Sequence, residues 1–246
     1  MAALKSLMTL NVQRKQAVKK IVGILAVLMV AAVVFFVLNN PLNKLVKLAI
    51  EDFGQDMVQA EVRVNSVNIS ATDGKGQLNG LHLGNPEGFR TDHAFRAETI
   101  EIEIEPASVT KNVIVLRQVL IDTPSIIYEK GDSGSNFDVI QRNVEAYLGT
   151  KGKHDKAEGK KLIIDSFIIR NAKVNYDGKL DLSLPDIELH DIGKKNGGAT
   201  PAQVTKAIIA ELNTQMALSL AKTAAIGAVG GVAIGAGILI KNILGK

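Results

Sequence analysis

The feature that most constrains the fold is an apolar run of eighteen residues, Ile21 to Leu38, which contains no charged, polar or proline side chain. A helix of this length measures roughly 27 Å, close to the ~30 Å hydrocarbon core of a bilayer. Five basic residues and no acidic residue precede the run. The positive-inside rule therefore predicts that residues 1–20 stay in the cytoplasm and that the rest of the chain crosses the membrane.

We predict a cytoplasmic basic tail at 1–20 and an uncleaved transmembrane anchor at 21–40. The run is longer than the roughly 7–15 apolar residues of a cleaved signal peptide, and no Ala-x-Ala site follows it. A buried core helix is the remaining alternative, but it would have to hide apolar side chains on every face. The anchor residues are Ile21, Leu25, Leu28, Phe35 and Phe36.

The charge of the chain is divided unevenly. Residues 41–215 hold 21 Lys and Arg against all 25 Asp and Glu, a net charge of −4, and the remaining basic residues lie at the two ends. Basic ends suit anionic lipid head groups, whereas an acidic middle with 4% aromatic residues argues against nucleic-acid binding. The absence of cysteine excludes disulfides, thiolate catalysis and cysteine-based metal sites.

The segment 41–59 has the pattern of a juxtamembrane amphipathic helix. Pro41 suits its first turn, and Gly54 lies near its end. One apolar stripe follows the helical period and consists of Leu42, Leu45, Val46, Ala49 and Phe53. Two interpretations remain open: the helix seats the following domain on the outer leaflet, or it plugs one end of a sheet.

From Ala60 onward the apolar period becomes two, which indicates β-strands. The apolar parity changes after Val64, which predicts a bulge near Asn65-Ser66. The clearest strand is Thr99 to Glu105, where Ile100, Ile102 and Ile104 share one face and three glutamates share the other. A β-rich domain at 60–215 follows, with sub-blocks at 60–148 and 162–198 and a polar loop at 149–161.

The expected fold is α+β and mostly β, an antiparallel sheet with one apolar and one wet face. The apolar face of such a sheet must be covered by helices, a second sheet or a ligand. Few helices are available, and the two best candidates are Asn136 to Leu148 and a helix that begins at Thr200-Pro201.

The C-terminal segment 216–246 is apolar and rich in glycine. Gly227, Gly231 and Gly235 recur at a spacing of four, the small-residue pattern that lets membrane helices pack closely. We expect this segment to be a membrane-associated helix that packs through these glycines. A second membrane span, an interfacial helix and a soluble core helix remain open for residues 223–240.

No group of residues supports catalysis, a cofactor or a metal. The four histidines lack the spacing of a metal site. Ser108 and Lys111 match the S-x-x-K box of serine β-lactamases, but they follow a strand and lack the companion motifs, so we interpret them as a turn. Glu101, Glu103 and Glu105 are interpreted as a solvated strand face. The predicted protein is therefore not an enzyme.

The order of segments resembles the AsmA-like proteins of Gram-negative envelopes. The matching stretches are VNSVNISATDGKGQLNGLHLGNPEGF (64–89), TIEIEIEPASV (99–109), VLIDTPSIIYEKGDSGSNFDVIQRN (119–143) and LIIDSFIIRNAKVNYDGKLDLSLPDIELHDIG (162–193). The resemblance covers about two thirds of the chain, which is much shorter than the large members of the family. It implies an inner-membrane anchor, a periplasmic domain and a curled sheet with a lipid-holding groove.

On this basis we expect a protein that maintains the cell envelope by contacting or handling lipid. Ile100, Ile102 and Ile104 are the candidate groove residues, and a phospholipid is the candidate ligand. The alternative is a structural subunit of a membrane-bound envelope complex, which forms homo-oligomers or binds partner proteins through its glycine-rich C-terminal helix.

Overall fold

The computed structural model describes residues 41–70, 72–150 and 160–229. The chain divides into two units at Lys44, and the first unit contributes only the start of helix α2 (Pro41–Val58) to the described residues. The basic tail, the five predicted anchor residues and most of the glycine-rich end lie outside the described ranges. Within those ranges, no helix has the length and apolar character needed to cross a bilayer.

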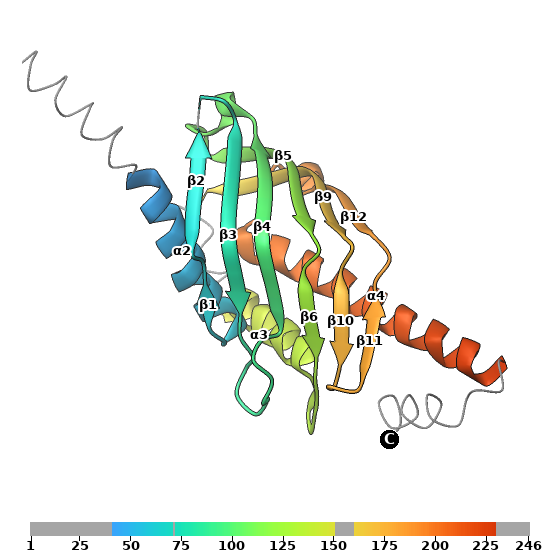
Figure 1. Cartoon of the computed structure of the whole chain (residues 1–246). Coiled ribbons are helices and arrows are strands. Elements are labelled where there is room, and N and C mark those ends of the chain that lie inside the picture. The colour runs from blue at the N-terminus through green and yellow to red at the C-terminus, as the bar shows by residue number, and fades with distance from the viewer. Residues whose placement is uncertain (1–40, 71, 151–159, 230–246) are drawn as a thin grey trace, which may run out of the picture. The chain divides into compact units, whose positions relative to one another are not determined.

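The second unit is built on one ten-stranded sheet (Figure 1). Several of these strands run on, after a short irregular stretch, into the next strand of the chain, so the sheet can be described as six long strands. The N-terminal half contains β1 (Val62–Arg63), β2 (Ser66–Ser70), β3 (Lys75–Leu83), β4 (Phe95–Ile104), β5 (Val113–Asp122) and β6 (Ser125–Tyr128). The C-terminal half contains β9 (Lys161–Arg170), β10 (Lys173–Tyr176), β11 (Leu180–Ser183) and β12 (Ile187–Ile192). A small hairpin, β7 (Lys130–Gly131) and β8 (Gly134–Ser135), stands apart from this sheet.

The expectation of a wholly antiparallel sheet is wrong at its centre. Strand β5 pairs with β9 in parallel, and β6 pairs with β10 in parallel, whereas every other pair in the sheet is antiparallel. The reason is the crossover between β6 and β9, which contains helix α3 (Asn136–Thr150). A crossover of this length returns the chain to the end at which the earlier strand began, and parallel pairing follows.

A line of irregular positions crosses all six long strands, and we call it the kink line. In a regular strand the residues that face the core are two apart, but at this line they are three apart. The shifts run from Val64 to Val67, Leu78 to Leu81, Ala97 to Ile100, Ile121 to Pro124, Ile169 to Ala172 and Leu184 to Ile187. The predicted bulge near Asn65-Ser66 is confirmed as the first point on this line.

Backbone conformation explains the kink line at three strands. Gly80, Thr123 and Asn171 adopt positive φ angles of 65°, 53° and 54°. Each such residue shifts the alternation of its strand by one position, so that the apolar residues on both sides of the line face the core. Because the shifts coincide, the sheet stays paired across the line while it bends toward one face, and the result is the curled half-barrel in Figure 1.

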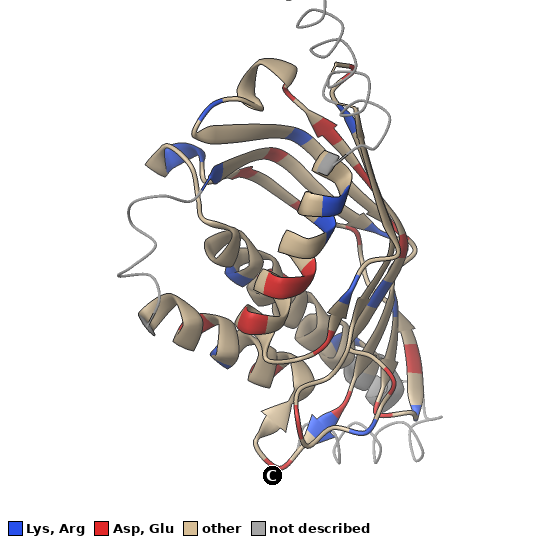
Figure 2. Cartoon of the chain, turned by 90° about the vertical axis from the view of Figure 1, so that its left-hand side faces the viewer, with Lys and Arg blue, Asp and Glu red and all other residues tan. Residues whose placement is uncertain are grey.

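The helices lie on the concave side of this sheet (Figure 2). Helix α3 contacts α4 (Pro201–Val229), and α4 also contacts β9 and β12. The buried Tyr176 hydroxyl on β10 donates a 2.6 Å hydrogen bond to the Met216 carbonyl of α4, which ties the helix to the sheet. The predicted domain boundary at 215/216 falls inside α4, where Met216 and Leu220 are buried in the core.

Capping boxes start both of these helices. Ser135 Oγ accepts from the Asp138 amide at 3.1 Å, while Asp138 Oδ2 accepts from the Ser135 amide at 2.8 Å. The Thr200 hydroxyl and the Gln203 amide oxygen make the same reciprocal pair at the start of α4. Each box satisfies amide groups that a helix leaves without intrahelical partners, so both predicted helix starts are confirmed.

Candidate functional site

The apolar face predicted from the alternating isoleucines is the concave face of the sheet. On the side of the kink line that contains β2, β5, β9 and β12, paired residues form three apolar rows. The row nearest the line contains Val67, Leu78, Ile100, Ile121, Ile169 and Ile187. The second contains Ile69, Gly76, Ile102, Val119, Phe167 and Leu189, and the third contains Ile104, Leu116, Ile164 and Ile192.

Burial of these rows is complete next to the kink line and only partial beyond it. Every member of the first row is buried. The second and third rows mix buried with half-buried side chains, and the half-buried ones are Ile69, Ile102, Leu116, Leu189 and Ile192. The concave face is therefore a closed core near the kink line and a partly open apolar surface farther from it. We call these five half-buried side chains the apolar rim.

The three predicted groove residues do not share one environment. Ile100 and Ile104 are 6% and 9% exposed and belong to the core or its margin, whereas Ile102 is half-buried and belongs to the apolar rim. The sequence identifies the face of the strand but not which row the helices cover. Ile69 and Leu116 also belong to the rim, although the alternation that predicts the groove at β4 does not point to them.

The convex face is polar where the sequence predicts it. Glu101 and Glu103 are exposed, and Glu105 is half-buried and forms an ion pair with Arg117. The three glutamates thus form a wet strand face rather than an acidic binding cluster.

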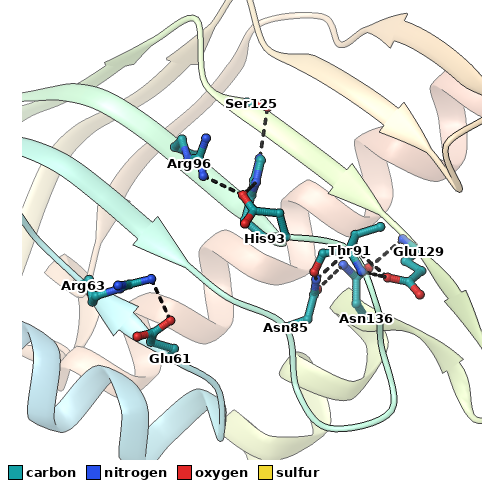
Figure 3. A network of polar contacts seen from close by, with 10 residues as sticks. Glu61, Arg63, Asn85, Thr91, His93, Arg96, Ser125, Glu129 and Asn136 are labelled. Atoms are coloured by element: carbon teal, nitrogen blue, oxygen red, sulfur yellow. Dashed lines mark hydrogen bonds and ion pairs between the residues drawn. The ribbon is translucent and has the colours of Figure 1, made fainter.

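A second group of residues, a polar clasp, lies at the other end of the sheet (Figure 3). We define the clasp as Asn85, Thr91, Glu129 and Asn136. Glu129 accepts from the amides of Arg90 and Thr91 and from the Thr91 hydroxyl at 2.7–3.0 Å. Asn136, which is fully buried, donates to Asn85 Oδ1 and to the Ile127 carbonyl, both at 2.7 Å.

The clasp joins the loop after β3 to the start of α3, two segments whose contact is not predicted by the sequence. Its side chains hydrogen-bond to one another and to backbone groups, and the described part of the chain has no buried side-chain N or O atom without a partner. A network that is satisfied in this way fixes a loop and offers no free group for chemistry. We therefore interpret the clasp as structural.

His93 extends the polar region toward β6. Its side chain is 6% exposed, its Nδ1 lies 3.1 Å from Asp92 Oδ2, and its Nε2 lies 3.2 Å from Ser125 Oγ. The hydrogen bond with His93, together with the Arg96 guanidinium, lowers the pKa of Asp92. The His93 ring thus bridges Asp92 and Ser125 as the histidine of a catalytic triad bridges its aspartate and serine, but here the ring is buried beside the sheet.

The pKa of Glu129 gives a pH prediction for the clasp. Burial favours the neutral carboxyl, but hydrogen bonds from Thr91 and Arg90 outweigh it and lower the pKa below the ordinary 4.5. The resulting stability is present above the unfolded-state pKa and is lost as the pH falls through the lower folded-state pKa. We expect urea unfolding to show Glu129→Gln less stable than the natural chain at pH ~7, with the difference shrinking toward pH ~3. A gap that is constant over this pH range would contradict the assignment.

The remaining motifs have structural roles or lie outside the described ranges. Ser108 is buried in the turn η1 (Pro106–Ser108), where its hydroxyl donates to the Glu105 carbonyl and accepts from the Val115 amide, so the predicted turn is confirmed. No cluster of three potential metal ligands occurs within the described ranges. Gly227 lies in α4, whereas Gly231, Gly235 and His154 are outside the described residues.

Comparison of the chain with protein-family models and with curated proteins finds no match. The resemblance to AsmA-like proteins therefore stays a prediction that rests on the quoted stretches. What the structure does establish is a mostly β, α+β fold with a curled sheet and helices on its concave side.

Proposed function

We propose that this protein is anchored in a bacterial inner membrane, exposes its β-rich domain to the periplasm and maintains the cell envelope by contacting lipid through its concave face. The observation that carries the proposal is the apolar rim. Five half-buried apolar side chains from four strands line the part of the concave face that the core does not close. Acyl chains can supply the missing apolar layer of such a face.

The charge distribution supports the same proposal. The rim residues face inward, and none of the three apolar rows on this face contains a charged residue, while the glutamates of β4 lie on the opposite face. An acyl chain binds an apolar, uncharged surface and gains roughly 25 cal/mol for each Å² removed from water. If residues 21–40 anchor the chain in a membrane, as the sequence and the AsmA-like resemblance predict, that surface would lie close to a source of phospholipid.

A pair of glutamine variants tests the proposal on the full chain. Ile102→Gln places a polar amide in the rim, and Glu103→Gln places the same amide on the exposed convex face one residue away. If the amide reduces the free energy of lipid binding by about 1.4 kcal/mol, the lipid binds roughly tenfold more weakly. After gentle detergent extraction, native mass spectrometry should show phospholipid bound to the natural chain and to Glu103→Gln, and strongly reduced on Ile102→Gln. Equal lipid on both variants, with unchanged thermal midpoints, would reject a lipid-binding rim.

The glycine spacing favours a second candidate function, a structural subunit of an envelope complex. Gly227, Gly231 and Gly235 would present bare backbone on one face if the helix continued past Val229. Under this alternative the detergent-extracted chain forms a defined oligomer. Gly231→Leu should then shift it to a monomer in size-exclusion chromatography with light scattering. A monomeric natural chain under the same conditions rules this alternative out.

A further inference from the structure

Helix α2 exposes apolar side chains on the face that points away from the sheet. Leu45, Leu48 and Phe53 are 63%, 43% and 58% exposed, and Ala49 is exposed between them. The predicted apolar stripe of this helix therefore lies mostly on the surface and does not plug the sheet. Its member Val46 is the exception, because it is half-buried on the side of the core.

Contacts with the sheet fix the rotation of α2. The Lys47 ammonium donates to the Val64 carbonyl, and Glu51 Oε1 accepts from the Val64 amide at 2.9 Å. Farther along, Met57 and Val58 are buried in the core. These contacts hold one face of the helix on the β1–β2 edge, so the exposed apolar side chains cannot turn inward to be covered.

Polarity changes along the exposed face. Its first half carries Leu45, Leu48 and Ala49, whereas its second half carries the exposed carboxylates Asp52 and Asp56, with the exposed Phe53 beside them. At 100° per residue, these residues lie within one face of the helix. An apolar surface that lacks carboxylates at the beginning of a helix suits a partner that contacts mainly that end, whereas the two carboxylates of the second half favour water.

The position of this face in the chain identifies the partner. The apolar run predicted to be the anchor ends at Leu38, and α2 begins at Pro41. If the run spans a bilayer, the first turns of α2 emerge at its surface, where apolar side chains are buried in the boundary between head groups and acyl chains. We propose that Leu45, Leu48 and Ala49 bind this boundary and that the helix rises from it, so that Asp52 and Asp56 lie in water.

This contact would hold the β1–β2 edge of the domain against the membrane and give it a fixed orientation. The inference rests on the predicted anchor and is independent of lipid binding in the apolar rim. It can hold for a structural subunit as well as for a lipid-handling protein.

Single spin labels can test the proposal, because the chain contains no cysteine. Leu45→Cys and Leu48→Cys probe the apolar half, and Asp52→Cys and Asp56→Cys are matched controls on the same helical face. Each full-length variant is labelled and reconstituted in phosphatidylcholine vesicles, and its collisions with apolar oxygen and a polar nickel complex are measured. We expect oxygen to dominate at positions 45 and 48 and the nickel complex to dominate at 52 and 56.

Two results would overturn the proposal. Preferential access of the nickel complex at all four positions would show that the first half of α2 lies in water. Exclusion of both reagents at 45 and 48 would show that protein covers this face. If the spin-label spectra also show dipolar broadening that disappears when unlabelled chain is added, the covering protein is a second copy of the chain. Lipid binding at Ile102 is measured separately, so either result leaves the proposed function to its own test.

Discussion

Replacing Asn136 by alanine should lower the free energy of unfolding by about 3 kcal/mol. The Asn136 side chain is fully buried, and its amide donates to Asn85 Oδ1 and the Ile127 carbonyl while its oxygen accepts from the Glu129 and Phe137 amides. Alanine leaves several of these groups buried without a partner, and each such group costs roughly 1–3 kcal/mol if water does not reach it. Urea unfolding followed by circular dichroism measures the change.

Asn68→Ala is the matched control for this experiment. Asn68 is exposed on β2, so its replacement should alter stability by less than about 0.5 kcal/mol. A loss at Asn136 no greater than at Asn68 would show that the clasp does not hold the loop after β3 against α3.

Replacing Gly80 by alanine should destabilise the domain by about 2–4 kcal/mol. Gly80 has a φ of 65° on the kink line, and a Cβ atom there would lie 2.1 Å from Asn65 Nδ2 and 2.5 Å from Asn65 Cγ. The substitution thus combines a strained backbone with a clash against the neighbouring edge strand. Thermal unfolding should show a lower midpoint for the variant.

Gly178→Ala separates the two causes. Gly178 has a nearly identical φ of 68°, but nothing lies within 4 Å of its would-be Cβ atom, so its replacement should cost only the backbone strain, about 1 kcal/mol. Adding Asn65→Ala to Gly80→Ala should recover part of the additional loss. Equal destabilisation at the two glycines would mean that the kink line tolerates a side chain and is not tightly packed.

Local features of the fold were predictable because their signals are local. The Thr200-Pro201 helix start, the helix from Asn136, the bulge near Asn65-Ser66 and the turn at Ser108 depend on residues a few positions apart. Alternation in Thr99 to Glu105 also identified which face of β4 is wet.

Features that join distant segments were not predictable in the same way. The parity shift at Asn65 is visible in one strand, but its alignment with shifts at Gly80 and Asn171 requires the strand register. The parallel pairing of β5 with β9 depends on where the crossover returns the chain to the sheet. An alternating apolar pattern does not reveal the direction in which a strand runs. The contact between Asn85 and Asn136 joins residues that are 51 positions apart in the chain. The sequence around each of them looks like that of an asparagine in an ordinary turn or helix cap.

Cross-linking with a photoreactive phospholipid would show directly whether lipid contacts the concave face. The full chain is reconstituted with a lipid that carries a diazirine in its acyl chain, irradiated, digested and mapped by peptide mass spectrometry. If lipid contacts this face, adducts should form on peptides of β2, β4 and β5 at Ile69, Ile102 and Leu116, in addition to adducts in the predicted anchor at 21–40. Adducts confined to the apolar run 21–38, the first half of α2 and the glycine-rich C-terminal segment would rule out lipid contact at the concave face.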